Sequence, residues 1–167
     1  MSISEYASSP RREQRILILG YGNPGRQDDG LGPAAVSEIE SLGLRNLTAF
    51  ENYQLNIEDA MDVATHDIVW FIDAARSGSS PYSVRTISPS LTIEFTSHLV
   101  RPEAILAIAH QCYGASPKAF VLAIRGYEFE FIEALTPGAK DNLVAALAML
   151  TGRIRALQHE LVPKELI

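Results

Sequence analysis

Three short apolar runs, separated by segments with helical periodicity, restrict the fold of this chain more than any other feature. The runs are β-branched or aromatic and bounded by turn residues, which is typical of buried strands in a parallel sheet: residues 15–20, 67–74 and 119–126. Two weaker strand candidates are expected nearer the sheet edges: 47–52 and 82–87. Segments with a helical pattern and a proline near the start alternate with the strands: 32–43, 101–114 and 136–161. This order predicts a three-layer α/β/α sandwich with a mostly parallel, twisted sheet of about five strands.

The length of 167 residues is common for one domain and allows a core without disulfides. We expect a flexible N-terminal tail over residues 1–14 and a single α/β domain over residues 15–167. The apolar run of residues 16–19 is too short for a signal-peptide core, and no stretch has the ~20 apolar residues that span a bilayer.

The charge balance argues against two classes of partner. With 14 basic and 20 acidic residues the formal net charge is -6 at pH 7. Gripping nucleic acid or an anionic membrane requires a positive field, so we expect neither partner. A single cysteine suits a reducing compartment, which predicts a cytoplasmic protein.

That cysteine, Cys112, shares a helical face with Ala104, Ile105 and Ile108. We therefore expect it to be a small core residue and not a catalytic thiol. Three of the four histidines are expected to be structural or solvated: His66, His110 and His159.

A glycine-rich loop follows the first apolar run, and its sequence supports two opposed interpretations. Gly20, Gly22 and Gly25 form the G-x-G-x-x-G pattern of a dinucleotide-binding turn, but Asp28 and Asp29 follow directly. Two unit charges ~4 Å apart interact by ~4 kcal/mol at an effective dielectric of 20, so the acid pair would repel a diphosphate. We expect no NAD or FAD binding, with a non-enzymatic nucleotide- or metal-binding α/β protein kept as the alternative.

Two further interpretations of this region stay open. Glu51 ends the next strand, where a ribose-binding acid belongs, which keeps the nucleotide alternative open. Structurally, Asp28 or Asp29 could cap a helix from about Gly30 to Leu42, worth about 0.5 to 2 kcal/mol. A cap needs only one side chain, so it leaves the second acid unexplained.

Ligands of such a sheet bind beyond the carboxyl ends of its strands. Asp29 follows the first strand, Asp73 ends a central strand and His98 lies in a later loop, so these side chains could converge at one edge. Two carboxylates and one imidazole suit a divalent transition metal such as zinc or nickel, with positions open for water or substrate. Spacing alone does not establish such a site.

Four motifs follow one another along the chain: "LILGYGNPGRQDDGLG", "IVWFIDAARSG", "FTSHLVRPEAILAIA" and "EALTPGAKDNLVAAL". In this order they resemble the motifs of the nickel-iron hydrogenase maturation endopeptidases. That family has G-x-G-N before an acid pair, a strand ending in Asp-Ala, a Ser/Thr-x-His segment and a Leu-Ser/Thr-Pro helix start. The chain departs from many relatives at Asn52, Tyr53 and Gln54, where they have glycines and a threonine, and this difference bears on substrate choice.

The resemblance implies an endopeptidase that removes the C-terminal extension of a hydrogenase large-subunit precursor after nickel insertion. The metal-contacting positions of the family correspond to Asp29, Asp73 and His98, and Asp28 matches the first acid of the pair. We take Asp28 and Asp29 as catalytic candidates, with Asp28 positioning a water molecule or the ligand loop. Nickel is expected to arrive on the precursor, and no organic cofactor is expected. Glu51 matches an acidic position after the second strand.

Overall fold

The computed structural model describes residues 12–90 and 100–159. Five strands form one sheet in the order β2-β1-β3-β5-β4, with β1, β2, β3 and β5 parallel and β4 antiparallel to β5. Their bounds are Ile16–Tyr21 for β1, Leu47–Asn52 for β2, Ile68–Ala75 for β3, Tyr82–Ile87 for β4 and Lys118–Arg125 for β5.

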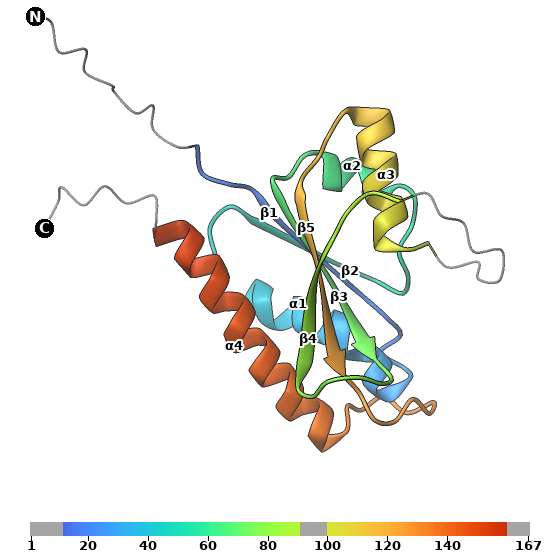
Figure 1. The fold of residues 1–167 in the computed structure, drawn as a ribbon. Helices are drawn as coiled ribbons and strands as arrows, with labels where there is room; N and C mark the ends of the chain where they lie inside the picture. Colours follow the sequence, from blue (N-terminus) through green and yellow to red (C-terminus); the bar gives the residue numbers. More distant parts are fainter. Residues whose placement is uncertain (1–11, 91–99, 160–167) are drawn as a thin grey trace, which may run out of the picture.

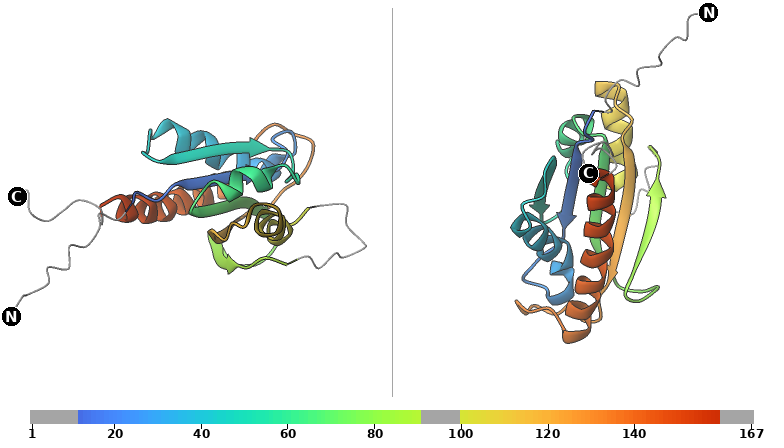
Figure 2. Two further views of the ribbon diagram at one scale, coloured as in Figure 1. Left: turned by 90° about the horizontal axis from the view of Figure 1, so that it is seen from above. Right: turned by 90° about the vertical axis from the view of Figure 1, so that its left-hand side faces the viewer.

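Helices cover both faces of this sheet (Figure 1, Figure 2). Helices α1 and α4 pack on one face and α2 and α3 on the other. The helical bounds are Gln27–Gly30 for the 3-10 turn η1, Leu31–Ser41 for α1, Asp59–Ala64 for α2, Pro102–Tyr113 for α3 and Pro137–His159 for α4. The described residues therefore form the expected three layers.

Alternating side chains of the central strands explain why both faces need cover. In β1, Ile16 and Ile18 contribute to the core under α1 and α4, while Leu17 and Leu19 contribute to the core under α2 and α3. Neighbouring residues of a strand point to opposite faces, so a strand with no polar position must be buried on both sides. Each of these four side chains is at most 1% exposed.

The predicted fold class is confirmed, and all five expected strands are present, with β2 and β4 at the edges. The six-residue helix α2 was not expected, because a segment of that length is too short to establish a helical period. Most of the predicted tail lies outside the described residues, although Arg12 pairs with Asp67 at 2.6 Å. None of the described helices is long and apolar enough to cross a membrane.

The start of the glycine-rich loop is held in place because α1 packs closely against the end of β1. A Cβ on Gly20 would lie 2.3 Å from the carbonyl oxygen of Gly32, and one on Gly32 would lie 2.4 Å from the carbonyl oxygen of Tyr21. Both distances are far below van der Waals contact, so only glycine fits at this crossing. The result is a helix held against the carboxyl edge of β1.

Candidate functional site

The turn η1, which follows the glycine-rich loop after β1, presents one carboxylate, that of Asp29, at the carboxyl edge of the sheet. Gly22 has a φ of 140°, and a Cβ there would lie 1.9 Å from the carbonyl oxygen of Asp29. The Asn23 backbone N–H donates to Oδ2 of Asp29 at 2.9 Å, and Asn23 Oδ1 accepts the Gly25 N–H at 2.8 Å. The glycines and Asn23 thus fix the backbone from which the Asp29 carboxylate projects.

Asp28 points the opposite way, into the protein, and is fully buried at 0% exposure. Its Oδ2 accepts hydrogen bonds from Tyr127 N–H at 2.7 Å, Glu128 N–H at 3.2 Å and the Thr136 hydroxyl at 2.7 Å. Its Oδ1 accepts the Thr136 N–H at 2.7 Å. Burial alone would raise the pKa of Asp28, but these hydrogen bonds outweigh it and lower the pKa below its usual value.

The Asp28 carboxylate therefore ties the glycine-rich loop to the segment that precedes α4. Of the two roles expected for it, holding the ligand loop is the one this geometry supports, because the buried carboxylate is shielded from solvent and substrate. The helix-cap interpretation of the acid pair is wrong. Gly30 occupies the N-cap of α1 without a side-chain hydrogen bond, since the chain makes the turn η1 before the helix begins.

Residues 126–136, which connect β5 to α4, lie beside this loop in Figure 1 and make further contacts with it. Gln27 bridges the two segments, because its Nε2 donates to Glu128 at 3.0 Å and its Oε1 accepts the Glu130 N–H at 2.9 Å. Arg26 places its guanidinium 5.0 Å from the ring centre of Phe131. This segment was not predicted as part of the site, although its alternation of aromatic and acidic residues is visible in the sequence.

Asp73 ends the buried part of β3 and lies close enough to Asp29 for their charges to interact. Burial, together with the negative charge of Asp29, raises the pKa of Asp73 to about 6, although hydrogen bonds from the Ala74 N–H and the Tyr21 hydroxyl act in the opposite direction. Ala74 N–H donates to Oδ1 of Asp73 at 2.7 Å. The two carboxylates expected to meet at the sheet edge are thus brought together.

Tyr21 supports Asp73 from β1. Burial raises the pKa of the Tyr21 hydroxyl, and its hydrogen bond to Asp73 raises it further, so this phenol stays protonated and acts as a donor. Behind it, Arg85 of β4 pairs with Glu103 of α3 at 2.6 Å. Sequence reasoning missed Tyr21, because nothing in the spacing links it to Asp73 until the parallel pairing of β1 with β3 is known.

This carboxylate pair has the character of a cation site. Neither Asp29 nor Asp73 forms an ion pair with a lysine or arginine in residues 12–90 or 100–159. Two neighbouring carboxylates with uncompensated charge fit a divalent ion. His98, the third expected ligand, lies outside the described residues, and the described part of the chain has no cluster of three metal-binding side chains.

The dinucleotide alternative lacks the helix start that it requires. After Gly25 the chain forms the short turn η1, and α1, whose N-terminal amides would have to face a pyrophosphate, begins only at Leu31. Glu51 is exposed at the end of β2, opposite Gly20 in the parallel register. No described feature near the loop favours a nucleotide.

The expectation that Cys112 is a core residue is wrong. Cys112 is exposed in the last turn of α3, because the buried face of this helix is formed by Ile105, Leu106 and Ala109. Among the histidines, His66 is half-buried with Nδ1 2.6 Å from the Asp62 carbonyl, and His110 is exposed with Nδ1 3.1 Å from the Ser116 hydroxyl. Neither of these contacts involves Asp29 or Asp73.

Replacing Cys112 by alanine is accordingly expected to leave the free energy of unfolding unchanged within about 0.5 kcal/mol, as at other exposed positions. Urea unfolding of both proteins measures this. Alkylation of the thiol in the folded wild type should leave precursor cleavage unchanged. Loss of cleavage in the alkylated, folded protein would instead implicate Cys112 in the reaction.

Comparison with known proteins gives a clear result at the level of structure. No family model and no curated protein sequence matches the chain. Among solved structures, the hydrogenase maturating endopeptidase HybD from E. coli superposes with a TM-score of 0.70 at 22% identity, covering 85% of this chain and 93% of HybD. This chain has the fold of the hydrogenase maturation proteases.

Archaeal structures agree. The [NiFe] hydrogenase maturation protease HycI from Thermococcus kodakarensis KOD1 has a TM-score of 0.68 at 16% identity, over 87% of this chain and 95% of HycI. The hydrogenase 2 maturation peptidase from Thaumarchaeota archaeon SCGC_AB-539-E09 has a TM-score of 0.62 at 21% identity, over 84% of this chain and 98% of that protein. The match spans nearly the whole of each of these proteins, so the shared fold includes the carboxyl edge of the sheet.

Proposed function

We propose that this chain is a hydrogenase maturation endopeptidase that removes the C-terminal extension of a nickel-iron hydrogenase large-subunit precursor after nickel insertion. The observation that carries the proposal is that the charges of Asp29 and Asp73 interact at the carboxyl edge of a sheet with the fold of these proteases. The ordered sequence motifs add independent support.

Within this proposal the side chains have separate tasks. Asp29 and Asp73, together with His98, would hold the nickel ion that arrives on the precursor. Bound there, the ion would position the scissile peptide; the alternative is that the ion itself acts as the Lewis acid on the peptide carbonyl. Tyr21 orients the Asp73 carboxylate through its hydroxyl, and Asp28 holds the loop that carries Asp29. Asp28 is therefore a positioning residue that acts through Asp29.

The nickel ion belongs to the substrate in this scheme. Two carboxylates and one imidazole leave coordination positions open, and ligands fixed on the precursor would fill them. Strong binding then requires both halves of the site, so a precursor without nickel keeps its extension. This arrangement would make maturation depend on correct metal insertion.

We expect cleavage only when nickel is on the precursor. The comparison uses nickel-loaded and nickel-free precursor at equal concentration, with enzyme either stripped by a chelator or incubated with nickel and desalted. The C-terminal mass of the large subunit is the readout. The stripped enzyme should process the loaded precursor, and the nickel-treated enzyme should leave the nickel-free precursor intact.

Two results would contradict this scheme. Equal cleavage of the nickel-free precursor would show that the enzyme does not need nickel to recognise its substrate. Cleavage only by the metal-treated enzyme would favour a metalloprotease with a resident ion. A catalytically blocked Asp29→Ala variant, incubated in parallel, shows that any mass change comes from this chain.

A further inference from the structure

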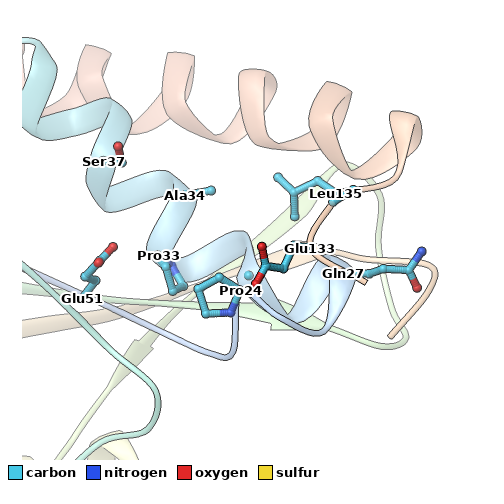
Figure 3. Close-up of a pocket in the computed structure, with 10 residues that line it drawn as sticks. Pro24, Gln27, Pro33, Ala34, Ser37, Glu51, Glu133 and Leu135 are labelled. Atoms are coloured by element: carbon cyan, nitrogen blue, oxygen red, sulfur yellow. The ribbon is translucent and has the colours of Figure 1, made fainter. Parts of the chain in front are cut away.

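A recess of about 440 Å³ lies between the start of α1 and the segment before α4, on the side of the glycine-rich loop where Gly30 follows Asp29 (Figure 3). Its walls are largely apolar and rigid, because prolines contribute from two sides. Four apolar residues and two acids contribute to its lining: Pro24, Pro33, Ala34, Leu135, Glu51 and Glu133. None of them belongs to the carboxylate pair Asp29 and Asp73.

Two carboxylates border this recess, one from each wall. Figure 3 shows Glu51, from the end of β2, at one end, followed by Pro33 and Pro24 and then by Glu133, from the segment before α4, with Gln27 beyond it. Among the residues that the structure describes, no lysine, arginine or histidine lines the recess. Within the described ranges, neither carboxylate is paired with a cation or accepts a hydrogen bond.

A smaller recess of about 150 Å³ continues the first one and shares Pro24, Pro33 and Glu51 with it. Tyr53 also lines the smaller recess and is 74% exposed, which is a large exposure for an aromatic side chain. Because they share lining residues, the two recesses form one groove, which is lined largely by apolar residues and carries the negative charges of Glu51 and Glu133. Such a groove suits an extended peptide, with side chains that alternate between apolar contact and a positive charge.

We propose that this groove binds an extended segment of the protein substrate that carries a lysine or arginine between apolar residues. The basic head would lie between Glu51 and Glu133, and its methylene stem would pack on Pro24 and Leu135. An organic cation is favoured over a metal ion because the described lining offers two carboxylates and no third metal-binding side chain. The inference rests on the proposed function for the identity of the substrate, and it adds a recognition site apart from the nickel-binding carboxylates.

Steady-state cleavage of the nickel-loaded precursor tests the site with Glu51→Gln, Glu133→Gln and the double variant. Removing one carboxylate from a partly exposed ion pair should raise KM about fivefold and leave kcat unchanged, and the double variant should raise KM further. Glu40→Gln is the matched control, since Glu40 is also an exposed acid near α1 but does not line the groove. Rising salt should increase KM for the wild type more than for the double variant.

A second measurement does not depend on cleavage. The probe is the peptide acetyl-Gly-Val-Arg-Ala-Val-amide, compared with the same peptide carrying neutral citrulline in place of arginine. Backbone amide chemical shifts of Gly30, Ala34, Ser37 and Leu135 should move with the arginine peptide in the wild type, and not with the citrulline peptide or in the double variant.

The outcomes separate the two proposals. Unchanged KM in the double variant, with normal cleavage by the wild type, would overturn the groove and leave the protease function standing. If the wild type cleaves no precursor, the peptide titration alone decides. Equal shifts with arginine and citrulline, or none with either, would then overturn the groove as a site for a basic segment.

Discussion

Alanine at Asp29 or Asp73 is expected to abolish cleavage of the nickel-loaded precursor while the chain stays folded. Each substitution removes one of the two carboxylates that would hold the ion, and a site built from few ligands cannot compensate for the loss of one. The measurement is the C-terminal mass of the precursor, with circular dichroism as the check on folding. The resemblance predicts the same loss for His98→Ala.

The charge of Asp73 is also expected to lower the free energy of unfolding at neutral pH, so the residue serves the site at a cost in stability. Its pKa of about 6 in the folded chain lies above the ordinary value of 3.8. The folded state therefore binds more protons than the unfolded state between these values, and wild-type stability falls as the pH rises from about 4 to about 6. Asp73→Asn removes this charge, keeps an acceptor for the Ala74 N–H, and should increase the free energy of unfolding at pH 7 by on the order of 1–3 kcal/mol.

Urea unfolding at pH 7 and at pH 3.5 measures this effect, which should vanish at the lower pH because the wild-type carboxyl is then protonated as well. Asp141→Asn is the control, since Asp141 is an exposed acid on α4. Normal cleavage by the Asp29 and Asp73 variants would remove both residues from the site. A destabilised Asp73→Asn at pH 7 would show that the charge supports the fold instead of a ligand.

The strands and most helices could be predicted because their patterns are local. The runs at β1, β3 and β5 have no polar interruption, which is sufficient to place them inside a parallel sheet. The convergence of Asp29 and Asp73 could also be predicted, since the carboxyl ends of parallel strands share an edge. These inferences need only strand direction, which follows from the alternation of strands with helices.

Other features could not be predicted because they depend on contacts between distant segments. Cys112 has apolar neighbours at helical spacing, yet the helix turns it to solvent, and only the packing of α3 on the sheet decides this. Asp28 and Asp29 are adjacent and chemically identical, but one is buried and the other faces the edge. The difference comes from the N–H groups of Tyr127 and Thr136, which donate to Asp28 and lie about 100 positions further along the chain.

Asp28→Ala is expected to destabilise the chain and to lower cleavage, although Asp28 does not contact substrate. The change removes the acceptor of the N–H groups of Tyr127, Glu128 and Thr136, whose hydrogen bonds to Asp28 are partly buried. A hydrogen bond to a charged group contributes about 1.5–3 kcal/mol, and the change removes several of them, so the loss should be about 3 kcal/mol or more. Against a typical total of about 5–15 kcal/mol, the chain should still fold, with the glycine-rich loop and the segment before α4 detached from each other.

Two further variants distinguish this role from catalysis. Thr136→Val removes one of the four hydrogen bonds, the one that its hydroxyl donates at 2.7 Å, and should produce a smaller loss of both stability and activity. Asp28→Asn keeps the shape of the side chain but turns an NH2 group toward N–H donors, so it should resemble alanine more than the wild type. Hydrogen exchange at the amides of Tyr127, Glu128 and Thr136 reports the detachment directly. If Asp28→Asn stops cleavage while these amides stay as protected as in the wild type, Asp28 acts in the reaction itself, and its assignment as a positioning residue fails.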